Sequence, residues 1–157
     1  MSTILKLSEA SSLAFHAMAL LARHSEARIS ATKMAELFHA SEHTLAKVMN
    51  GLVRAHFVDS VRGASGGFLL VRDPQKITLL DIYEAIDGSL REQHCLLGKP
   101  ACDGEHCPMQ GLMEKLHQEL HGYFSRTTLD AFARSLRLTG VFPNDTTSGK
   151  RTKAREV

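Results

Sequence analysis

Two short amphipathic segments separated by a three-residue link constrain the fold of this chain more than any other feature. Ser30 and Ser41 are candidate N-caps for two consecutive helices. In the second helix apolar residues recur at i, i+3, i+4, i+7 and i+8, namely Leu45, Val48, Met49, Leu52 and Val53. The link "HAS", residues 39–41, allows only a tight turn, so the pattern predicts a helix-turn-helix whose second helix has a polar outward face.

The segment directly after this motif predicts a β-hairpin. Residues 57–61 and 68–71 are rich in β-branched, aromatic and other apolar side chains, and Arg62 and three glycines separate them. Glycines permit a tight tip, and an arginine there can enter the minor groove of DNA, where the negative potential is deepest. An ordinary surface hairpin is the alternative, but its place after a helix-turn-helix favours a DNA-binding wing.

Helical spacing extends on both sides of this unit. A first helix is expected from about Ser8 to His24, and Thr78 with Asp81 forms a capping box that opens another helix before Gly88. The fold class is therefore mainly α, a winged helix-turn-helix with a small β-hairpin wing and a long C-terminal dimerisation helix. We expect four parts: a DNA-binding domain with the N-terminal helix (1–90), a cysteine loop (91–108), dimerisation helices (109–140) and a disordered basic tail (141–157).

The longest amphipathic pattern follows Pro108. Its apolar stripe needs a partner helix to cover it, and a second copy of the chain can supply one. We interpret the stripe as a homodimer interface, with packing on the chain's own first helix as the alternative. The interface residues expected from this pattern are Leu112, Met113, Leu116, Leu120 and Phe124.

All three cysteines of this 157-residue chain lie between residues 95 and 107. The N-terminus lacks the zones of a signal peptide and no apolar run approaches the roughly 20 residues of a membrane span, so we expect a cytoplasmic protein without membrane contact. Thiols stay reduced there, and three cysteines cannot all pair within one chain, which favours metal ligation or redox sensing over a disulfide framework. A zinc site completed by His94 or His106 and a thiol redox switch both remain open.

An enzyme is the rival class. Cys107, His106 and Glu105 supply the residue types of a cysteine nucleophile with its base and carboxylate, but consecutive residues rarely converge on one substrate atom. The sequence also contains no Gly-rich phosphate loop and no H-E-x-x-H motif. We therefore expect no enzymatic activity; a winged protein that binds other proteins instead of DNA is a third alternative.

Polar residues on the predicted docking surface are the candidate DNA contacts. The net charge of +2 is too small to indicate nucleic-acid binding by itself, so the prediction rests on where the polar residues lie. The early residues of a recognition helix meet base edges in the major groove, and flanking hydroxyl and basic groups meet phosphates. A solvated helix face is the alternative for Lys47 and Arg54. The candidates are Ser30, Thr32, Glu42, His43, Thr44, Lys47, Arg54, Arg62, Ser65 and Gly66.

Residues 5 to about 138 resemble a known family. The motifs that carry the resemblance are "LKLSEASSLAFHAMALLA" near the start, the wing "VRGASGGFLL" and the helix "ITLLDIYEAIDG". They are similar to the dimeric winged-helix transcription regulators typified by the iron-sulfur cluster regulator IscR, the nitric-oxide-sensing repressor NsrR and the iron-responsive regulator RirA. The resemblance implies a homodimeric regulator, expected to be a repressor, that binds a pseudo-palindromic double-stranded operator. Its affinity would depend on a 2Fe-2S or 4Fe-4S cluster held by Cys95, Cys102 and Cys107.

The fourth cluster ligand is where this sequence departs from the family pattern. Related regulators have a histidine three residues after the last cysteine, or an acidic residue, in some cases with a histidine, on the first helix. Here Gln110 occupies the first position and Ser12 the acidic position, whereas His16 matches the histidine position and Glu9 lies on the same helix face. The candidates are therefore His16 or Glu9 of the partner subunit, with half-buried packing as the alternative for His16.

Overall fold

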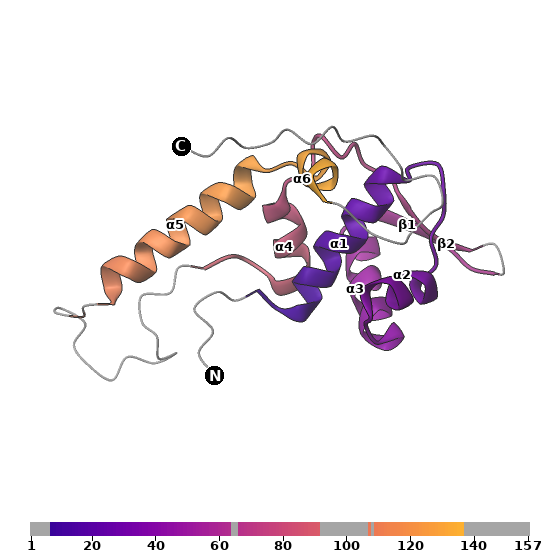
Figure 1. The fold of residues 1–157 in the computed structure, drawn as a ribbon, viewed down its shortest axis with the longest axis horizontal. Helices are drawn as coiled ribbons and strands as arrows, with labels where there is room; N and C mark the ends of the chain where they lie inside the picture. Colours follow the sequence, from indigo (N-terminus) through magenta and orange to yellow (C-terminus); the bar gives the residue numbers. More distant parts are fainter. Residues whose placement is uncertain (1–6, 64–65, 92–106, 108, 137–157) are drawn as a thin grey trace, which may run out of the picture.

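The structure is a computed structural model that describes residues 7–63, 66–91, 107 and 109–136. The elements in chain order are α1 (Glu9–Arg23), α2 (Ala31–Phe38), α3 (Glu42–Arg54), β1 (Val58–Val61), β2 (Gly67–Leu70), α4 (Leu79–Asp87), α5 (Gln110–Arg126) and α6 (Leu129–Ser135). Figure 1 shows one helical body from which α5 projects at one end and the β1–β2 hairpin at the other. This order confirms the predicted winged helix-turn-helix with a long C-terminal helix.

Serine and threonine side chains cap the helices at the positions that the sequence predicts. The hydroxyl oxygens of Ser8, Ser30 and Ser41 accept hydrogen bonds from backbone N–H groups in the first turns of α1, α2 and α3. Thr78 and Asp81 form the reciprocal capping box of α4. Each cap satisfies a backbone donor that the helix leaves open and contributes about 0.5–2 kcal/mol, so local chemistry alone places these helix starts.

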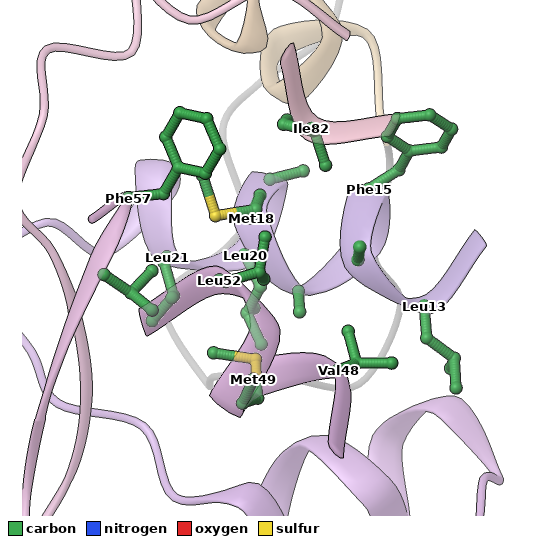
Figure 2. Packing of buried hydrophobic residues seen from close by; sticks show 14 of the residues in the cluster. Leu13, Phe15, Met18, Leu20, Leu21, Val48, Met49, Leu52, Phe57 and Ile82 are labelled. Atoms are coloured by element: carbon green, nitrogen blue, oxygen red, sulfur yellow. The ribbon is translucent and has the colours of Figure 1, made fainter. Parts of the chain in front are cut away.

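The hydrophobic core surrounds α1, which is buried over most of its length and packs against α3, α4, α6 and β2. Figure 2 shows Met18 and Leu20 of α1 gathered with Leu52 of α3, with Ile82 of α4 and with Phe57, which directly precedes β1. The stripe predicted for α3 lies on this side, because four of its five residues are buried and Val53 is half-buried. Burial of one face of α3 leaves the opposite face to solvent.

The hairpin is attached to the body at a defined point. β1 and β2 pair antiparallel, and the backbone groups of Ile29 and Phe68 exchange hydrogen bonds of 3.1 and 2.9 Å. Gly67 has φ 147°, and a Cβ there would lie 2.8 Å from the Ile29 backbone, so the close approach requires glycine. β1 begins one residue later than the predicted 57–61, and β2 begins and ends one residue earlier than the predicted 68–71. The Val71 N–H still donates to the Phe57 carbonyl oxygen at 3.0 Å, so the backbone pairing continues just beyond the strand ends.

The apolar stripe predicted for α5 is buried within the chain at some residues and exposed at others. Phe124 is buried against the rings of Phe15 and Tyr83, with centroid distances of 5.4 and 5.9 Å. Met113 is also buried, Leu116 and Leu120 are half-buried, and Leu112 is 46% exposed. The chain's own body therefore covers the C-terminal end of the stripe, where the sequence left dimer and intrachain packing as alternatives. The homodimer interface stays a prediction for the remaining residues.

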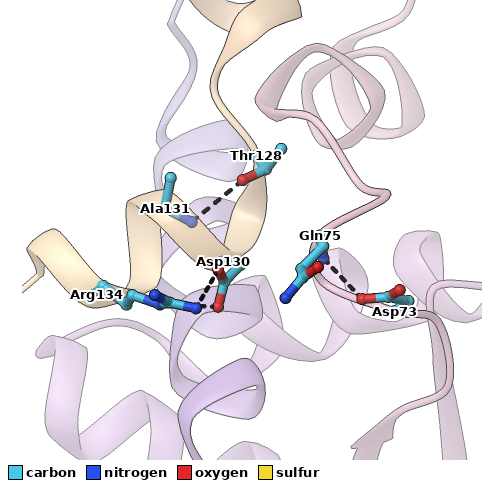
Figure 3. A network of polar contacts seen from close by, with 6 residues as sticks. All are labelled: Asp73, Gln75, Thr128, Asp130, Ala131 and Arg134. Atoms are coloured by element: carbon cyan, nitrogen blue, oxygen red, sulfur yellow. Dashed lines mark hydrogen bonds and ion pairs between the residues drawn. The ribbon is translucent and has the colours of Figure 1, made fainter.

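Backbone hydrogen bonds connect α6 to the segment before α4. The N–H groups of Leu129 and Asp130 donate to the carbonyl oxygens of Ile77 (2.7 Å) and Pro74 (3.1 Å). Figure 3 shows the neighbouring side-chain contacts, which include the ion pair of Asp130 with Arg134 at 2.7 Å. That pair is on the surface and contributes at most about 1 kcal/mol, so the backbone contacts hold α6 in place. None of the helices in the described ranges has the length and apolar character needed to cross a membrane.

Candidate nucleic-acid interface and cysteine segment

The N-terminal turns of α3 present polar side chains to solvent. Glu42, His43 and Lys47 are exposed, Thr44 is half-buried, and Arg54 is exposed at the other end of the helix. The apolar face of the same helix packs on α1, which fixes the direction of the polar face. A helix exposed in this way can enter the major groove with its first residues toward the base edges.

One hydrogen bond joins two of the predicted DNA contacts to each other. The Thr32 hydroxyl of α2 donates to Glu42 Oε1 of α3 at 2.9 Å. The sequence predicts that the Thr32 hydroxyl donates to a phosphate, whereas in the structure this hydroxyl donates to the carboxylate of Glu42. Glu42 is also the first residue of α3, where the helix dipole favours a negative charge. The side chain of Glu42 is therefore fixed at the start of the recognition helix.

Of the two polar side chains of the wing that are predicted to contact DNA, one belongs to the described residues. Arg62 is exposed directly after β1, and Ser65 lies outside the described residues. The Gly66 N–H donates to the Gly63 carbonyl oxygen at 2.9 Å, and a Cβ on Gly66 would collide with the Val61 carbonyl oxygen. The absence of a side chain at Gly66 therefore permits the close turn of the wing. Its predicted contact with DNA, through the backbone, stays a prediction.

Arg72 is a residue that the sequence analysis missed. Its guanidinium lies 4.8 Å from the centroid of the Phe57 ring and donates to the Ala55 carbonyl oxygen at 3.3 Å. These contacts connect the end of β2 with the end of α3, so they hold the wing relative to the recognition helix. The sequence signal was an arginine just beyond a predicted strand, and its partner became visible only in the fold.

The cysteine segment lies largely outside the described residues. Cys95 and Cys102 fall there, together with the alternative zinc ligands His94 and His106. Cys107 is half-buried with a free thiol, and its carbonyl oxygen accepts a hydrogen bond of 3.2 Å from the N–H of Gln110, the first residue of α5. Across the described ranges no three potential metal ligands come together.

The candidate fourth ligands lie on α1. His16 is half-buried, and its ring packs edge-on against Phe38 and Phe132 at centroid distances of 5.9 and 6.4 Å. Its Nδ1 lies 2.7 Å from the Ser12 carbonyl oxygen. This is the packing role that the sequence analysis kept as the alternative. Glu9 is exposed as the first residue of α1, and a ligand role for either residue stays a prediction.

Asp87 connects the end of α4 with the start of α1. Its carboxylate accepts hydrogen bonds from the hydroxyls of Ser8 (2.9 Å) and Ser11 (2.7 Å), which are 79 and 76 residues away. Burial raises the pKa of Tyr83, and the negative charge of Asp87 raises it further. Asp87 lies four residues before the cysteine segment in the chain, so the contact fixes the chain just ahead of that segment to the start of α1. The sequence alone indicates only that this helix ends before Gly88 and assigns Asp87 no role.

A single known family model covers the helix-turn-helix, the wing and the long helix α5. The family model Rrf2, described as an iron-dependent transcriptional regulator, matches residues 7–135, which span all eight elements of the fold. The chain belongs to the Rrf2 family. This confirms the resemblance stated from the sequence motifs. Members of the Rrf2 family are transcription regulators that bind DNA and typically act as dimers, and they are not enzymes.

Similar proteins agree with this assignment. A protein of Aquifex aeolicus (strain VF5) named as an HTH-type transcriptional regulator is 31% identical over 116 residues, which are 72% of this chain and 81% of that protein. The structure of CymR, the global cysteine regulator of B. subtilis, has a TM-score of 0.69 and 27% identity over 85% of this chain and 99% of CymR. T. potens IscR has a TM-score of 0.63 and 26% identity over 83% of this chain and 88% of IscR.

Proposed function

We propose that this Rrf2 chain is a cytoplasmic homodimeric repressor that binds a pseudo-palindromic operator and is controlled by an iron-sulfur cluster. The DNA-binding half rests on the polar N-terminal face of α3, exposed beside a wing that carries Arg62. Lys47 supplies a cation for a base or a phosphate, and His43 supplies a donor or an acceptor according to its tautomer. Two such surfaces in a dimer would read two half-sites about one helical turn, or a multiple of it, apart.

The cluster half of the proposal rests on the donor set and on the family. Cys95, Cys102 and Cys107 would hold the cluster, because soft thiolates are the ligands that iron-sulfur clusters prefer. Cys107 is half-buried and lies at the start of α5 with its thiol free, which fits a ligand role. When bound, the cluster would supply a centre whose redox state and occupancy respond to iron, oxidants or nitric oxide. The description of the family as iron-dependent supports this proposal.

We propose that ordering of the cysteine segment acts on α3 through contacts of the described residues next to it. The segment follows α4, whose last residue Asp87 is bound by the hydroxyls of Ser8 and Ser11 at the start of α1. α1 packs directly on α3, which bears the proposed reading surface. Ordering of the segment around metal would therefore shift the population of reading-competent dimers, without any contact between cluster and DNA.

The fourth ligand is proposed as His16 or Glu9 of the partner subunit. In favour of His16, its Nδ1 lies 2.7 Å from the Ser12 carbonyl oxygen, which can only accept; in the neutral ring Nδ1 therefore donates and Nε2 is the nitrogen that could bind a metal. A carbonyl partner on one ring nitrogen is the usual support for a histidine that binds metal through the other.

A thiol- or zinc-controlled regulator of the same fold is the second candidate. The likeness to CymR, a cysteine regulator, favours it, since the three clustered cysteines could respond to thiol chemistry without iron. In that case the operator affinity would depend on the thiol oxidation state or on zinc, and the docking surface on α3 would be unchanged.

One experiment tests the function and separates the candidates. Anaerobically purified protein is assayed for iron, sulfide and zinc and by its visible spectrum. A fluorescently labelled operator is then titrated with holo protein, apo protein and the three single Cys→Ala variants. We expect cluster loss in every variant and a common shift in affinity of roughly 5- to 150-fold, the range of typical allosteric coupling. Stoichiometric zinc in a colourless protein would favour the second candidate, and equal affinity in all five samples would contradict thiol control of either kind.

A further inference from the structure

We propose that Glu42 reads a cytosine in each operator half-site and that Thr32 is its positioning residue. The inference rests on the proposed DNA-binding function and deepens it, since it assigns a base to one position of the reading surface. It starts from the hydrogen bond of 2.9 Å between the Thr32 hydroxyl and Glu42 Oε1, which joins two side chains on this surface.

Glu42 occupies the place on α3 that approaches the base edges most closely. It is the first residue of the helix, its side chain is exposed, and its exposed neighbour on the same turn is His43. The N-terminal residues of a recognition helix are those that contact bases in helix-turn-helix complexes. A side chain here faces bases or solvent, because the buried face of α3 is turned toward α1.

Thr32 prepares the carboxylate for this contact. Its hydroxyl donates to Oε1, which leaves Oε2 as an acceptor for a base. A side chain that is already fixed in the free protein loses less conformational entropy on binding than a freely rotating one. The place of Glu42 in the first turn of α3 also suits a negative charge, because the helix dipole is positive there.

A carboxylate on a DNA-binding surface contributes selectivity instead of general affinity. Phosphates repel it, so it is favourable only where a base presents an amino group. In the major groove the adenine amino group lies between two acceptors, N7 of adenine and O4 of thymine. The cytosine amino group has an acceptor, O6 of guanine, on one side only. A fixed carboxylate oxygen therefore meets less repulsion at cytosine, which is also the base that glutamate ordinarily reads.

The competing explanation is that the Thr32–Glu42 bond only ties α2 to α3. A purely structural bond predicts that its loss lowers the melting temperature and leaves sequence preference unchanged. A reading role predicts the opposite pattern, because the bond is exposed and exposed polar contacts add little to stability.

The test is parallel selection of random double-stranded DNA by the wild-type protein and four variants. Glu42→Gln removes the charge at the proposed reader, and Glu84→Gln removes the same charge from an exposed position of α4 as the matched control. Thr32→Val removes the donor, whereas Thr32→Ser keeps it. The affinity of each protein is then measured for the selected site, for the site with the cytosine replaced, and for unrelated DNA.

We expect the wild-type protein to select a cytosine at a symmetric position in both half-sites and to bind the replaced site roughly 5- to 150-fold more weakly, the usual cost of one mismatched base pair. Glu42→Gln should lose this preference and bind unrelated DNA more tightly, with at most a small fall in melting temperature from the lost charge at the helix N-terminus. Thr32→Val should weaken the preference, and Thr32→Ser and Glu84→Gln should keep it.

Different outcomes contradict different statements. If Glu42→Gln selects the same cytosine as the wild-type protein, the reading role is wrong. If Thr32→Val and Thr32→Ser behave alike, the positioning role of Thr32 is wrong. A wild-type pool without any enriched sequence would instead contradict the proposed operator-binding function itself.

Discussion

Replacement of Phe124 by alanine is expected to destabilise the folded chain strongly, although the residue lies on the helix predicted to form the dimer. Phe124 is 5% exposed. Its ring meets Phe15 at 5.4 Å in an edge-on geometry and Tyr83 at 5.9 Å. These contacts join the projecting helix α5 to α1 and α4. The variant would leave a cavity where three elements meet.

The expected cost follows from the size of the deleted group. Removal of a buried phenylalanine side chain costs about 3–5 kcal/mol, which includes the lost transfer free energy and the cavity. Favourable aromatic pair geometry adds about 0.5–1.5 kcal/mol per pair to simple burial, and the variant loses the pairs with Phe15 and Tyr83 and a ring contact of 6.4 Å with the adjacent Tyr123. The upper half of the range is therefore expected. The neighbouring Tyr123 is 55% exposed and shares one ring contact of 6.4 Å with Phe124, so Tyr123→Ala should lower the free energy of unfolding of the isolated chain by about 1 kcal/mol or less.

Urea unfolding of both variants at several protein concentrations is the assay. A contact within one chain lowers the free energy of unfolding by the same amount at every concentration, whereas a contact between subunits makes the loss depend on concentration. We expect a large, concentration-independent loss for Phe124→Ala. A loss below about 1 kcal/mol, or one that varies with concentration, would refute the intrachain role of Phe124.

Three further predictions address DNA binding, dimerisation and pH. Lys47→Ala and Arg62→Ala should weaken operator binding without a change in melting temperature. Loss of a phosphate contact should lower the salt slope by about one, and unchanged affinity in both variants across a salt series would contradict the docking surface. Leu112→Asp should give a folded monomer in analytical ultracentrifugation, because this stripe residue is 46% exposed within the chain; an intact dimer would exclude it from the interface. Burial and Asp87 raise the pKa of Tyr83, so the folded chain holds the phenol proton more tightly than the unfolded chain does. The stability that this difference adds is complete below pH about 10 and is lost as the pH rises further. Tyr83→Phe should reduce this alkaline loss in urea titrations, and an identical pH profile would contradict the assignment.

Local interactions explain why the sequence alone located the helices so closely. Ser30 and Ser41 bond to backbone groups three residues away, and Thr78 with Asp81 closes a capping box over the same distance. Such contacts depend on neighbours in the chain and not on the rest of the fold. The apolar period of α3 likewise determines which side of the helix is buried whatever covers it, so the exposure of Lys47 could be predicted.

The choice of partner for each surface was decided by the tertiary structure. Periodicity showed one apolar stripe on α5, but it could not show that Phe15 and Tyr83 of the same chain cover Phe124 while Leu112 remains exposed. A stripe records only that an apolar face needs burial. The hydrophobic effect has no direction, so any apolar surface of matching shape can satisfy it.

The partners of polar side chains that are distant in the sequence were likewise decided by the tertiary structure. The types of Thr32 and Glu42 made both candidates for DNA contact, but only the crossing of α2 and α3 brings the hydroxyl to the carboxylate. The bonds from Ser8 and Ser11 to Asp87 join residues more than 70 positions apart. The sequence by itself determined the helices, the wing and the residue types on the reading surface, because these depend on chain neighbours. The pairing of those side chains depends on how the elements pack, because a hydrogen bond requires its two groups to lie within about 3 Å of each other.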